Sequence, residues 1–430
     1  MHELGISSDL VLANAALPRF VYWEGLGSAE RLANLHALPT NLPGDLFTFG
    51  LLTWPGRIRA ALGAVGLISP PPPAPYEESV REFVTRHLGE ETFERIIDPF
   101  VSGVYAGDPD YLAMRSALKK IHRLEGLGDF GNGLVSGAIT RFKEIDREKK
   151  DSPPDPNWPT YKSGELGSFL KGLSTLPNAI EAHLTSERVK LNHELVKIEK
   201  DPETNLFHAT FKIDEETTKT YVGKTLVLTS PPIPTAKTVP SSLIPSADLL
   251  NNVYSPPVAS VTCAIKKKHF RELPGGTPES PLRGFGHLLP RRMGIRSLGC
   301  IWSSSLFPNR CPSDYELLLT YIGGARDEEI GSMSEDEILE VVRADIKKVM
   351  LKEGTIPEDV ELLGMRVWPR AIPQYGRGHE EILSKIADEE ARVPGLWLGG
   401  NYRTGVAFGD CVKYGLEQAS VVEDYLSTKK

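Results

Sequence analysis

Residues 395–412 read GLWLGGNYRTGVAFGDCV, an apolar strand pattern followed by a glycine-rich turn and the start of a helix. Glycines such as Gly399 and Gly400 allow the backbone of such a turn to approach a ligand closely. A helix that starts near Val406 would direct backbone N–H groups and the positive end of its dipole at an anionic or electron-rich group. A pyrophosphate or a reduced flavin ring would suit that position, and an ordinary turn between a strand and a helix is the alternative.

Further strand patterns precede this turn. A short apolar strand is predicted at 226–228, where Pro231 and Pro232 stop it. Longer strand patterns cover 258–265, 298–304 and 317–324. Ser334 and Glu337 form a capping box that predicts a helix over EDEILEVVRADIKKVM. Strands interspersed with helices predict a mixed α/β fold.

Residues 40–145 are predicted to form a mostly helical module. The stretch 46–68 carries only Arg57 and Arg59 as charges. Two central arginines exclude a membrane-spanning helix, which leaves a buried core helix or an interfacial helix on a lipid surface. A second helix is predicted from apolar residues at helical spacing: Val80, Phe83, Val84 and His87.

Composition excludes several classes of protein. The 430 residues include 49 Lys+Arg and 57 Asp+Glu, giving a formal net charge of −8. A hydrophobic content of 40% excludes a wholly disordered chain, and the acidic balance argues against a nucleic-acid binder. The four cysteines lack C-x-x-C spacing and are predicted to be reduced structural thiols, with no metal site. The N-terminal residues lack a signal-peptide pattern and read like the middle of a domain.

Two segments and three histidines are interpreted as structural. Gly126–Gly131 matches G-x-G-x-x-G, but it follows a charged helical pattern rather than a strand and is predicted to be a turn between helices. The charged, proline-rich stretch 144–160 is predicted to be a solvated loop. His193, His208 and His287 lie in strand patterns, where a structural role is expected.

Ten ordered segments of the chain form a recognisable series: LGISSDLVLA (4–13), PRFVYWEG (18–25), LHALPTNLP (35–43), ERIIDPFVSGVYAGDP (94–109), FLKGLSTLPNAI (169–180), SPPVASV (255–261), GFGHLLPRRMGIRSLGCIWSSSLFPNRCP (284–312), LLLTYIGGA (317–325), RVWPRAIPQY (366–375) and GLWLGGNYRTGVAFGDCV (395–412). Together these segments resemble the plastid-type protoporphyrinogen oxidases, a flavoprotein family of tetrapyrrole biosynthesis.

The resemblance implies a three-part architecture. An α/β flavin domain with a discontinuous Rossmann-like sheet is assembled from separated segments, and it is joined by an antiparallel-sheet substrate domain and a helical membrane-binding insertion. The implied segments are 1–15, 163–250 and 386–430 for the flavin domain, 16–145 for the helical domain, 146–162 for a linker and 251–385 for the substrate domain. The strand–GxGxxG–helix of the family, which holds the FAD diphosphate, would precede residue 1.

The implied reaction is the oxygen-dependent, six-electron oxidation of protoporphyrinogen IX to protoporphyrin IX, with hydride transfer to FAD and release of hydrogen peroxide. The chemistry is that of the flavin, so no catalytic side chain is expected. By resemblance, Arg19 binds a substrate propionate, since an arginine fork suits a carboxylate. The pocket-lining positions are Gly286, Leu288, Ile301 and Tyr321, for which strand core is the alternative role.

For FAD, the resemblance implies contacts from Leu195, Trp368, Val406, Ala407 and Phe408, with plain core as the alternative for Trp368. Two features depart from the family pattern. LGSAERLAN (26–34) interrupts a link that is usually short, and Arg403, beside the flavin, is expected to alter its electrostatics.

The implied partners are a porphyrinogen, molecular oxygen and a membrane surface, with a homodimer left open and no nucleic acid expected. The implied location is the plastid membrane, with the mitochondrial inner membrane as the alternative. Two other functions stay open: an inactive porphyrin-binding homologue, and a flavin oxidase acting on coproporphyrinogen III or an amine.

Overall fold

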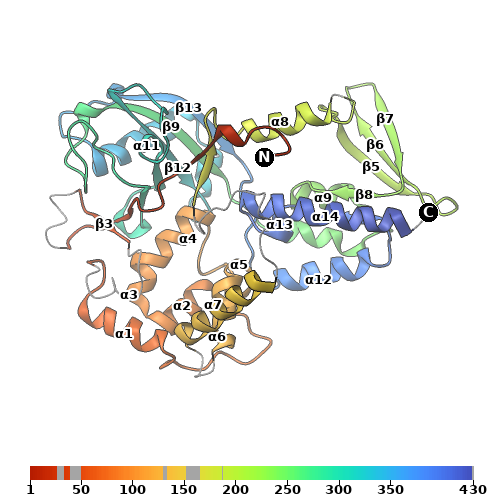
Figure 1. The fold of residues 1–430 in the computed structure, drawn as a ribbon, viewed down its shortest axis with the longest axis horizontal. Helices are drawn as coiled ribbons and strands as arrows, with labels where there is room; N and C mark the ends of the chain where they lie inside the picture. The colour runs from red at the N-terminus through yellow and green to blue at the C-terminus, as the bar shows by residue number, and fades with distance from the viewer. Residues whose placement is uncertain (27–32, 39–49, 129–132, 152–164, 186, 429–430) are drawn as a thin grey trace. The chain divides into compact units, whose positions relative to one another are not determined.

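The computed structural model describes residues 1–26, 33–38, 50–128, 133–151, 165–185 and 187–428. The chain divides into two compact units (Figure 1). The first comprises Met1–Ala179 and Pro256–Ala371, and the second comprises Ile180–Ser255 and Ile372–Lys430. Within the described residues, no helix is both long and apolar enough to cross a membrane. The finer division into flavin, substrate and helical domains stays a prediction.

A mixed sheet dominates the first unit, with seven strands among the described residues. In spatial order it contains β13 (Val360–Trp368), β9 (Val258–Lys266), β12 (Tyr315–Gly323), β11 (Ser297–Trp302), β10 (Gly286–Leu288), β2 (Arg19–Tyr22) and β3 (Leu35–Ala37). Neighbours are antiparallel except β10 and β2, which are parallel. The strands predicted at 258–265, 298–304 and 317–324 are confirmed.

Helix α11 (Glu335–Met350) contributes apolar side chains to the same core as this sheet. It starts with the predicted capping box, in which Ser334 and Glu337 satisfy each other's backbone N–H groups. Ile338, Val342 and Ile346 recur at helical spacing and are buried in that core. Short elements complete the sheet region: η6 (Lys267–His269), η7 (Arg291–Met293), α10 (Ser303–Leu306), η8 (Glu328–Gly331) and η9 (Pro357–Asp359).

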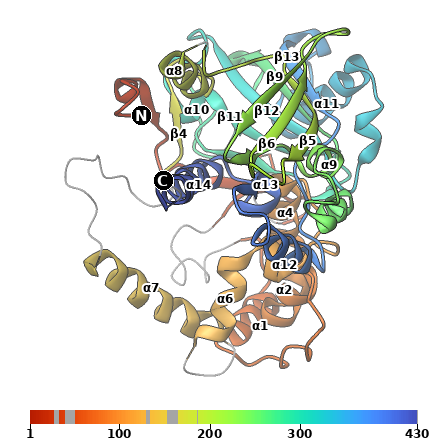
Figure 2. The same ribbon diagram turned by 90° about the vertical axis from the view of Figure 1, so that its right-hand side faces the viewer.

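The helical module of the first unit runs through α1 (Trp54–Ala64), α2 (Val80–Leu88), α3 (Glu90–Thr92), the π-helical turn η4 (Phe93–Ile97), α4 (Asp98–Tyr105), α5 (Met114–Ala117), α6 (Lys119–Leu127) and α7 (Leu134–Asp151). The four apolar-face residues predicted for the second helix are all buried in α2. Helices α6 and α7 pack closely (Figure 2) because Gly137 has no side chain; a Cβ there would lie 1.9 Å from the Leu124 carbonyl.

Two sequence interpretations can be judged in this module. The glycine motif begins inside α6 and not after a strand, as predicted, although Asp129–Gly131 lie outside the described residues. The loop predicted over 144–160 is wrong up to Asp151, where α7 continues, and the linker over 146–162 stays a prediction. Arg141 pairs with Glu144 and Glu148 along this helix, which stabilises a charged segment that lacks apolar periodicity. Residues 152–160 lie outside the described residues.

At the start of the first unit, η1 (Ser7–Asp9) leads into β1 (Leu10–Leu12), which pairs with β4 (Gly167–Phe169). Helix α8 (Thr175–Leu184) follows and carries the chain into the second unit.

The second unit contains a three-stranded antiparallel sheet of β5 (Glu194–Lys200), β6 (Phe207–Lys212) and β7 (Thr218–Gly223) among the described residues. A separate parallel pair joins β8 (Leu226–Leu228) to β14 (Leu396–Leu398). The helices are α9 (Pro232–Thr238), η5 (Pro245–Asn252), α12 (His379–Glu390), α13 (Asn401–Thr404) and α14 (Phe408–Thr428). The strand and the helix predicted at the C-terminus are therefore confirmed as β14 and α14, and the glycine turn between them contains the short helix α13.

Candidate functional site

The first unit encloses a cavity of about 220 Å³ against its sheet. Strands β2, β10, β11 and β12 and helix α4 contribute to its walls. The lining residues are mostly apolar: Arg19, Phe20, Leu38, Phe100, Gly103, Val104, Phe285, Gly286, His287, Leu288, Gly299, Cys300, Ile301 and Tyr321. We call this the sheet cavity.

All five residues predicted to bind substrate line the sheet cavity: Arg19, Gly286, Leu288, Ile301 and Tyr321. Strand register explains why they meet. Gly286 on β10 lies opposite Arg19 on β2 and opposite Ile301 on β11. Two residues further along, Leu288 lies opposite Gly299, which lies opposite Tyr321 on β12. Residues two apart share a face of a sheet, so the two rows present their side chains to one space.

Two glycines keep the strands of the sheet cavity close together. Gly286 has φ +144°, and a Cβ there would lie 2.1 Å from the Cys300 carbonyl oxygen. At Gly299 a Cβ would lie 2.8 Å from the His287 carbonyl oxygen. Any larger residue would therefore push β10 away from β11, and the sequence shows this only as glycines within strand patterns.

Among the described residues that line the cavity, Arg19 is the cationic one. The Arg19 guanidinium lies over the Phe285 ring, 4.8 Å from its centroid, which orients it by a cation–π contact. Among the described carboxylates, none is in salt-bridge contact with Arg19. Burial raises the pKa of Tyr321, so its hydroxyl stays protonated and can donate a hydrogen bond. The site thus offers a cation and a neutral donor within an apolar enclosure.

His287 borders the cavity but is a structural histidine, as predicted. Its ring is buried, and its Nδ1 accepts a hydrogen bond of 3.1 Å from Trp302 Nε1. Burial lowers the pKa of His287 to about 3, so the ring is neutral at physiological pH. His193 likewise has protein partners, the Leu191 carbonyl and the Tyr221 hydroxyl.

Helix α4 supplies a wall of the cavity that sequence reasoning did not find. Phe100, Gly103 and Val104 come from it. A Cβ at Gly103 would lie 2.4 Å from Leu288 Cδ2, so the glycine allows α4 to pack directly against Leu288 of β10. In the sequence, these three residues stand at positions i, i+3 and i+4. This spacing indicates that they share a helix face, but not that the face lines a cavity.

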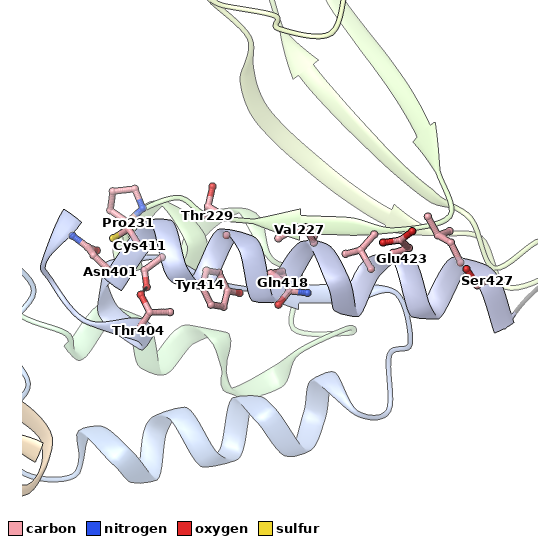
Figure 3. A pocket seen from close by; sticks show the side chains of 15 residues that line it. Val227, Thr229, Pro231, Asn401, Thr404, Cys411, Tyr414, Gln418, Glu423 and Ser427 are labelled. Atoms are coloured by element: carbon pink, nitrogen blue, oxygen red, sulfur yellow. Dashed lines mark hydrogen bonds between the residues drawn. The ribbon is translucent and has the colours of Figure 1, made fainter. Parts of the chain in front are cut away.

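The second unit contains a larger cavity, of about 990 Å³, along one face of α14 (Figure 3). We call it the helix cavity. From α14 it is lined by residues at helical spacing: Cys411, Tyr414, Gly415, Gln418, Ala419, Val422, Glu423, Leu426 and Ser427. Opposite them lie Val227, Thr229 and Pro231, and the turn residues Gly400, Asn401 and Thr404 close one end.

The closed end of the helix cavity coincides with the carboxyl ends of two parallel strands, β8 and β14. Such strand ends are the usual ligand-binding edge of α/β sheets. Gly400 with φ +116° and Gly405 with φ +124° give the turn a backbone that only glycine adopts readily. The 21-residue α14 begins directly after this turn, at Phe408. A planar, electron-rich group would meet backbone N–H groups there.

The residues predicted to contact the flavin are distributed over both units. Leu195 lies on β5 and packs against the core of the second unit, while Val406 and Ala407 directly precede α14 and Phe408 is its first residue. Trp368 ends β13 in the first unit and is 42% exposed, which excludes a role as a buried core residue. The roles of all five stay predictions.

The sequence model of the flavin containing amine oxidoreductases matches residues 1–422. The chain belongs to this family. The chloroplastic protoporphyrinogen oxidase of Nicotiana tabacum is 42% identical over 427 residues, which cover 99% of this chain and 74% of the relative. That of Oryza sativa subsp. japonica is 43% identical over 428 residues, covering 99% of this chain and 76% of the relative.

Solved structures show the same fold. A protein from Exiguobacterium sp. 255-15, provisionally named a protoporphyrinogen oxidase, matches with a TM-score of 0.70 at 19% identity, over 99% of this chain and 83% of its own. Cyclohexylamine oxidase from Brevibacterium oxydans IH-35A matches with a TM-score of 0.55 at 11% identity, over 99% and 84%. The mixed α/β fold, the FAD cofactor, the oxidoreductase class and the resemblance to protoporphyrinogen oxidases are thereby confirmed.

One ion pair holds the turn before α14. Arg403 does not add an unbalanced charge there, because its two Nη atoms pair with the Glu390 carboxylate at 2.8 and 2.7 Å. Burial alone would lower the pKa of Arg403, but Glu390 overcomes this and raises it. The same carboxylate accepts the Leu398 N–H, so the pair holds the end of β14 against α12. Arg403 therefore stabilises the turn by connecting it to α12.

Proposed function

We propose that this chain oxidises protoporphyrinogen IX to protoporphyrin IX with FAD and molecular oxygen. The observation that carries the proposal is the convergence of the five predicted substrate residues on the sheet cavity. The chloroplastic relatives at 42% and 43% identity, which are named protoporphyrinogen oxidases, support it.

Each part of the sheet cavity has a task in this reaction. Arg19 binds a propionate carboxylate, and the aromatic ring beneath it keeps the guanidinium in place. Leu288, Ile301 and the α4 wall contact the apolar macrocycle and exclude water. The Tyr321 hydroxyl is available to a polar edge of the substrate. These residues orient the substrate, and none of them needs to transfer a proton.

Val406, Ala407 and Phe408, with Leu195 of the same unit, would hold the flavin in this proposal, and the contact expected of Trp368 stays a prediction. When bound, the flavin supplies the two-electron acceptor that amino-acid side chains lack, and oxygen restores its oxidised form with release of hydrogen peroxide. The glycine turn gives close backbone approach, and the start of α14 gives N–H donors.

A side-by-side turnover assay tests the proposal. The chain is incubated with FAD, desalted, and given protoporphyrinogen IX, coproporphyrinogen III or an aliphatic amine at equal concentrations. We expect a retained flavin band and porphyrin fluorescence growing fastest with protoporphyrinogen IX. Faster turnover of coproporphyrinogen III or the amine would assign another substrate. Porphyrin binding without flavin or turnover would identify an inactive porphyrin-binding homologue.

We also propose that the helical module binds a membrane surface. Helix α1 places Trp54, Ile58 and Leu62 on one exposed face, with Trp54 62% exposed. Both of its arginines bind backbone carbonyls: Arg59 donates to the His87 and Arg86 carbonyls at the end of α2, and Arg57 Nε donates to the Leu52 carbonyl at 3.0 Å. Helix α7 adds an exposed Phe142. The exposure of α1 favours the interfacial alternative over the buried one.

Liposome sedimentation tests membrane binding. A Trp54→Ser/Ile58→Ser/Leu62→Ser variant is compared with Leu363→Ser, which removes an apolar side chain of similar exposure on β13. We expect the triple variant to lose most of its binding and Leu363→Ser to keep it. Equal sedimentation of both would contradict the proposal.

The proposed location is the plastid, since the relatives named above are chloroplastic; a mitochondrial relative of Nicotiana tabacum is 30% identical over 82% of this chain and 69% of its own. Fluorescence microscopy of the full-length gene product, expressed as a fluorescent fusion, distinguishes the two organelles. The homodimer stays a prediction, which light scattering of the purified chain tests.

A further inference from the structure

Three side chains tie α4 to the turn after β12. Asp98, in the first turn of α4, is buried and accepts a hydrogen bond from Arg326 Nη2. The same Nη2 donates to the Ser102 hydroxyl at 2.6 Å, and Ser102 Oγ donates to the Asp98 carbonyl at 2.8 Å. Arg326 therefore contacts two successive turns of α4. We call Asp98, Ser102 and Arg326 the α4 latch.

The far end of α4 is held by the same turn. Ala106, which ends the helix with φ +49°, accepts the Ala325 N–H at 2.8 Å. Gly324 has φ +89°, and a Cβ there would lie 2.7 Å from the Ala106 carbonyl oxygen. Both ends of α4 are thus fixed to residues 324–326, which directly follow β12.

These ties join two walls of the sheet cavity. Between its fixed ends, α4 presents Phe100, Gly103 and Val104 to the cavity. Strand β12 presents Tyr321, five residues before Arg326. A shift of α4 away from the turn would widen the space between these walls and release Leu288 from Gly103.

We propose that the α4 latch sets the width of the sheet cavity and so determines the affinity of the cavity for the porphyrin; this rests on the function proposed above. The latch acts through α4, so its members are positioning residues. A hydrogen-bonded pair of a buried carboxylate and an arginine suits this task because its geometry is narrow and its loss leaves Asp98 unpaired.

The chain offers a matched control. Arg296 pairs with Asp327 at 2.7 Å and with Glu329 at 3.0 Å, at the same turn, with a side-chain exposure of 34% against 29% for Arg326. None of the hydrogen bonds or ion pairs of Arg296 among the described residues reaches α4. Arg296→Met therefore removes a comparable ion pair without releasing the helix.

The experiment measures protoporphyrin IX affinity by fluorescence titration, and KM and kcat for protoporphyrinogen IX, on the FAD-loaded full chain. We expect Arg326→Met to weaken protoporphyrin IX binding and raise KM about tenfold while kcat changes less, since misplacing a wall impairs contact before chemistry. Arg326→Lys should recover part of the loss, because an ammonium can still reach Asp98. Arg296→Met should stay within about twofold of the parent chain.

Equal affinity of the parent chain and Arg326→Met would overturn the latch while leaving the proposed function intact. An equal loss in Arg296→Met would also overturn it, because the effect would then be general to the turn. If Arg326→Met does not fold, Asp98→Asn replaces it, with the same expectation. No protoporphyrin IX binding by the parent chain would refute the proposed function at this cavity, and the latch with it.

Discussion

The sheet cavity is walled by four strands whose register decides which side chains face one another, whereas the helix cavity lies along a single helix beside a parallel strand pair. In the sheet cavity, Gly286 lies opposite both Arg19 and Ile301 on its two neighbours. At the helix cavity, no residue of α14 is buried. One site is positioned by many backbone hydrogen bonds and the other by a turn and a helix end.

The difference teaches where each site is vulnerable. In the sheet cavity, the effect of a substitution on stability should depend mainly on backbone strain and side-chain volume, because neighbouring strands leave no space for relaxation. At the helix cavity, stability should depend mainly on one buried ion pair, because Arg403 and Glu390 connect the turn to the rest of the unit. Substitutions that separate these two causes test the comparison.

Arg403→Met should produce the largest effect. It leaves the Glu390 carboxylate, which is 8% exposed, buried without its partner, at a cost of about 3–5 kcal/mol. Urea unfolding followed by circular dichroism measures the loss. The control is Arg403→Met/Glu390→Met, which removes both charges and should recover most of the stability. Equal destabilisation by the single and double variants would show that the pair does not fasten the turn.

Gly286→Ala should destabilise the first unit by about 2–4 kcal/mol, because it combines a strained φ with a clash against the Cys300 carbonyl. Gly415→Ala is the matched change in the helix cavity: nothing lies within 4 Å of a Cβ there. In the interior of α14 it should stabilise the helix by about 0.5–1 kcal/mol. Thermal unfolding should show a lower unfolding temperature for Gly286→Ala and a higher one for Gly415→Ala. Shifts of the same sign in both variants would contradict the comparison.

These two glycines also show how far sequence reasoning reaches. Local patterns predicted the strand at 298–304, which pairs with Gly286, and the strand–turn–helix that contains Gly415, because period 2 and period 3.6 are local properties of the chain. The parallel pairing of β2 with β10 joins residues more than 260 positions apart, and local patterns hold no information on it. The family resemblance supplied the site residues that the register then brought together.

Acid should weaken the sheet cavity through His287. Its pKa of about 3 in the folded protein lies below the ordinary value of 6.5, so the unfolded chain binds the extra proton between these values. Stability is therefore complete above pH 6.5 and falls as the pH drops towards 3, by about 2 kcal/mol at pH 5. His287→Asn keeps an acceptor for Trp302 but cannot titrate. Thermal unfolding at pH 7.5 and pH 5 should show a smaller acid loss in this variant; an unchanged loss would assign it to other groups.

The prediction that failed concerns a charged segment. The charges of 144–151 lack apolar periodicity and so predict a loop, yet Arg141 pairs along α7 with Glu144 and Glu148. The sequence likewise does not show that Arg403 pairs with Glu390, which lies 13 residues earlier in the chain. A charge pattern gives no direction for a side chain, so the partner becomes known only from the fold.

Arg19→Ala should have the smallest effect on folding and a selective effect on binding. The residue is exposed, and its contact with Phe285 is the cation–π interaction already described, so the unfolding free energy should change by less than about 1 kcal/mol. Loss of a charge-assisted hydrogen bond to a propionate costs about 1.5–3 kcal/mol, which corresponds to a roughly ten- to hundredfold rise in the dissociation constant for protoporphyrin IX. Fluorescence titration measures that constant.

A porphyrin without propionates is the control ligand for Arg19, because it should bind the parent chain and Arg19→Ala equally if the arginine acts through a carboxylate. An equal loss of both porphyrins would mean that the guanidinium serves as packing over Phe285. Unchanged binding of protoporphyrin IX would remove Arg19 from the site. In that case the register of the strands would fix the walls of the sheet cavity, but the charged groups of the ligand would be bound by residues outside the sheet.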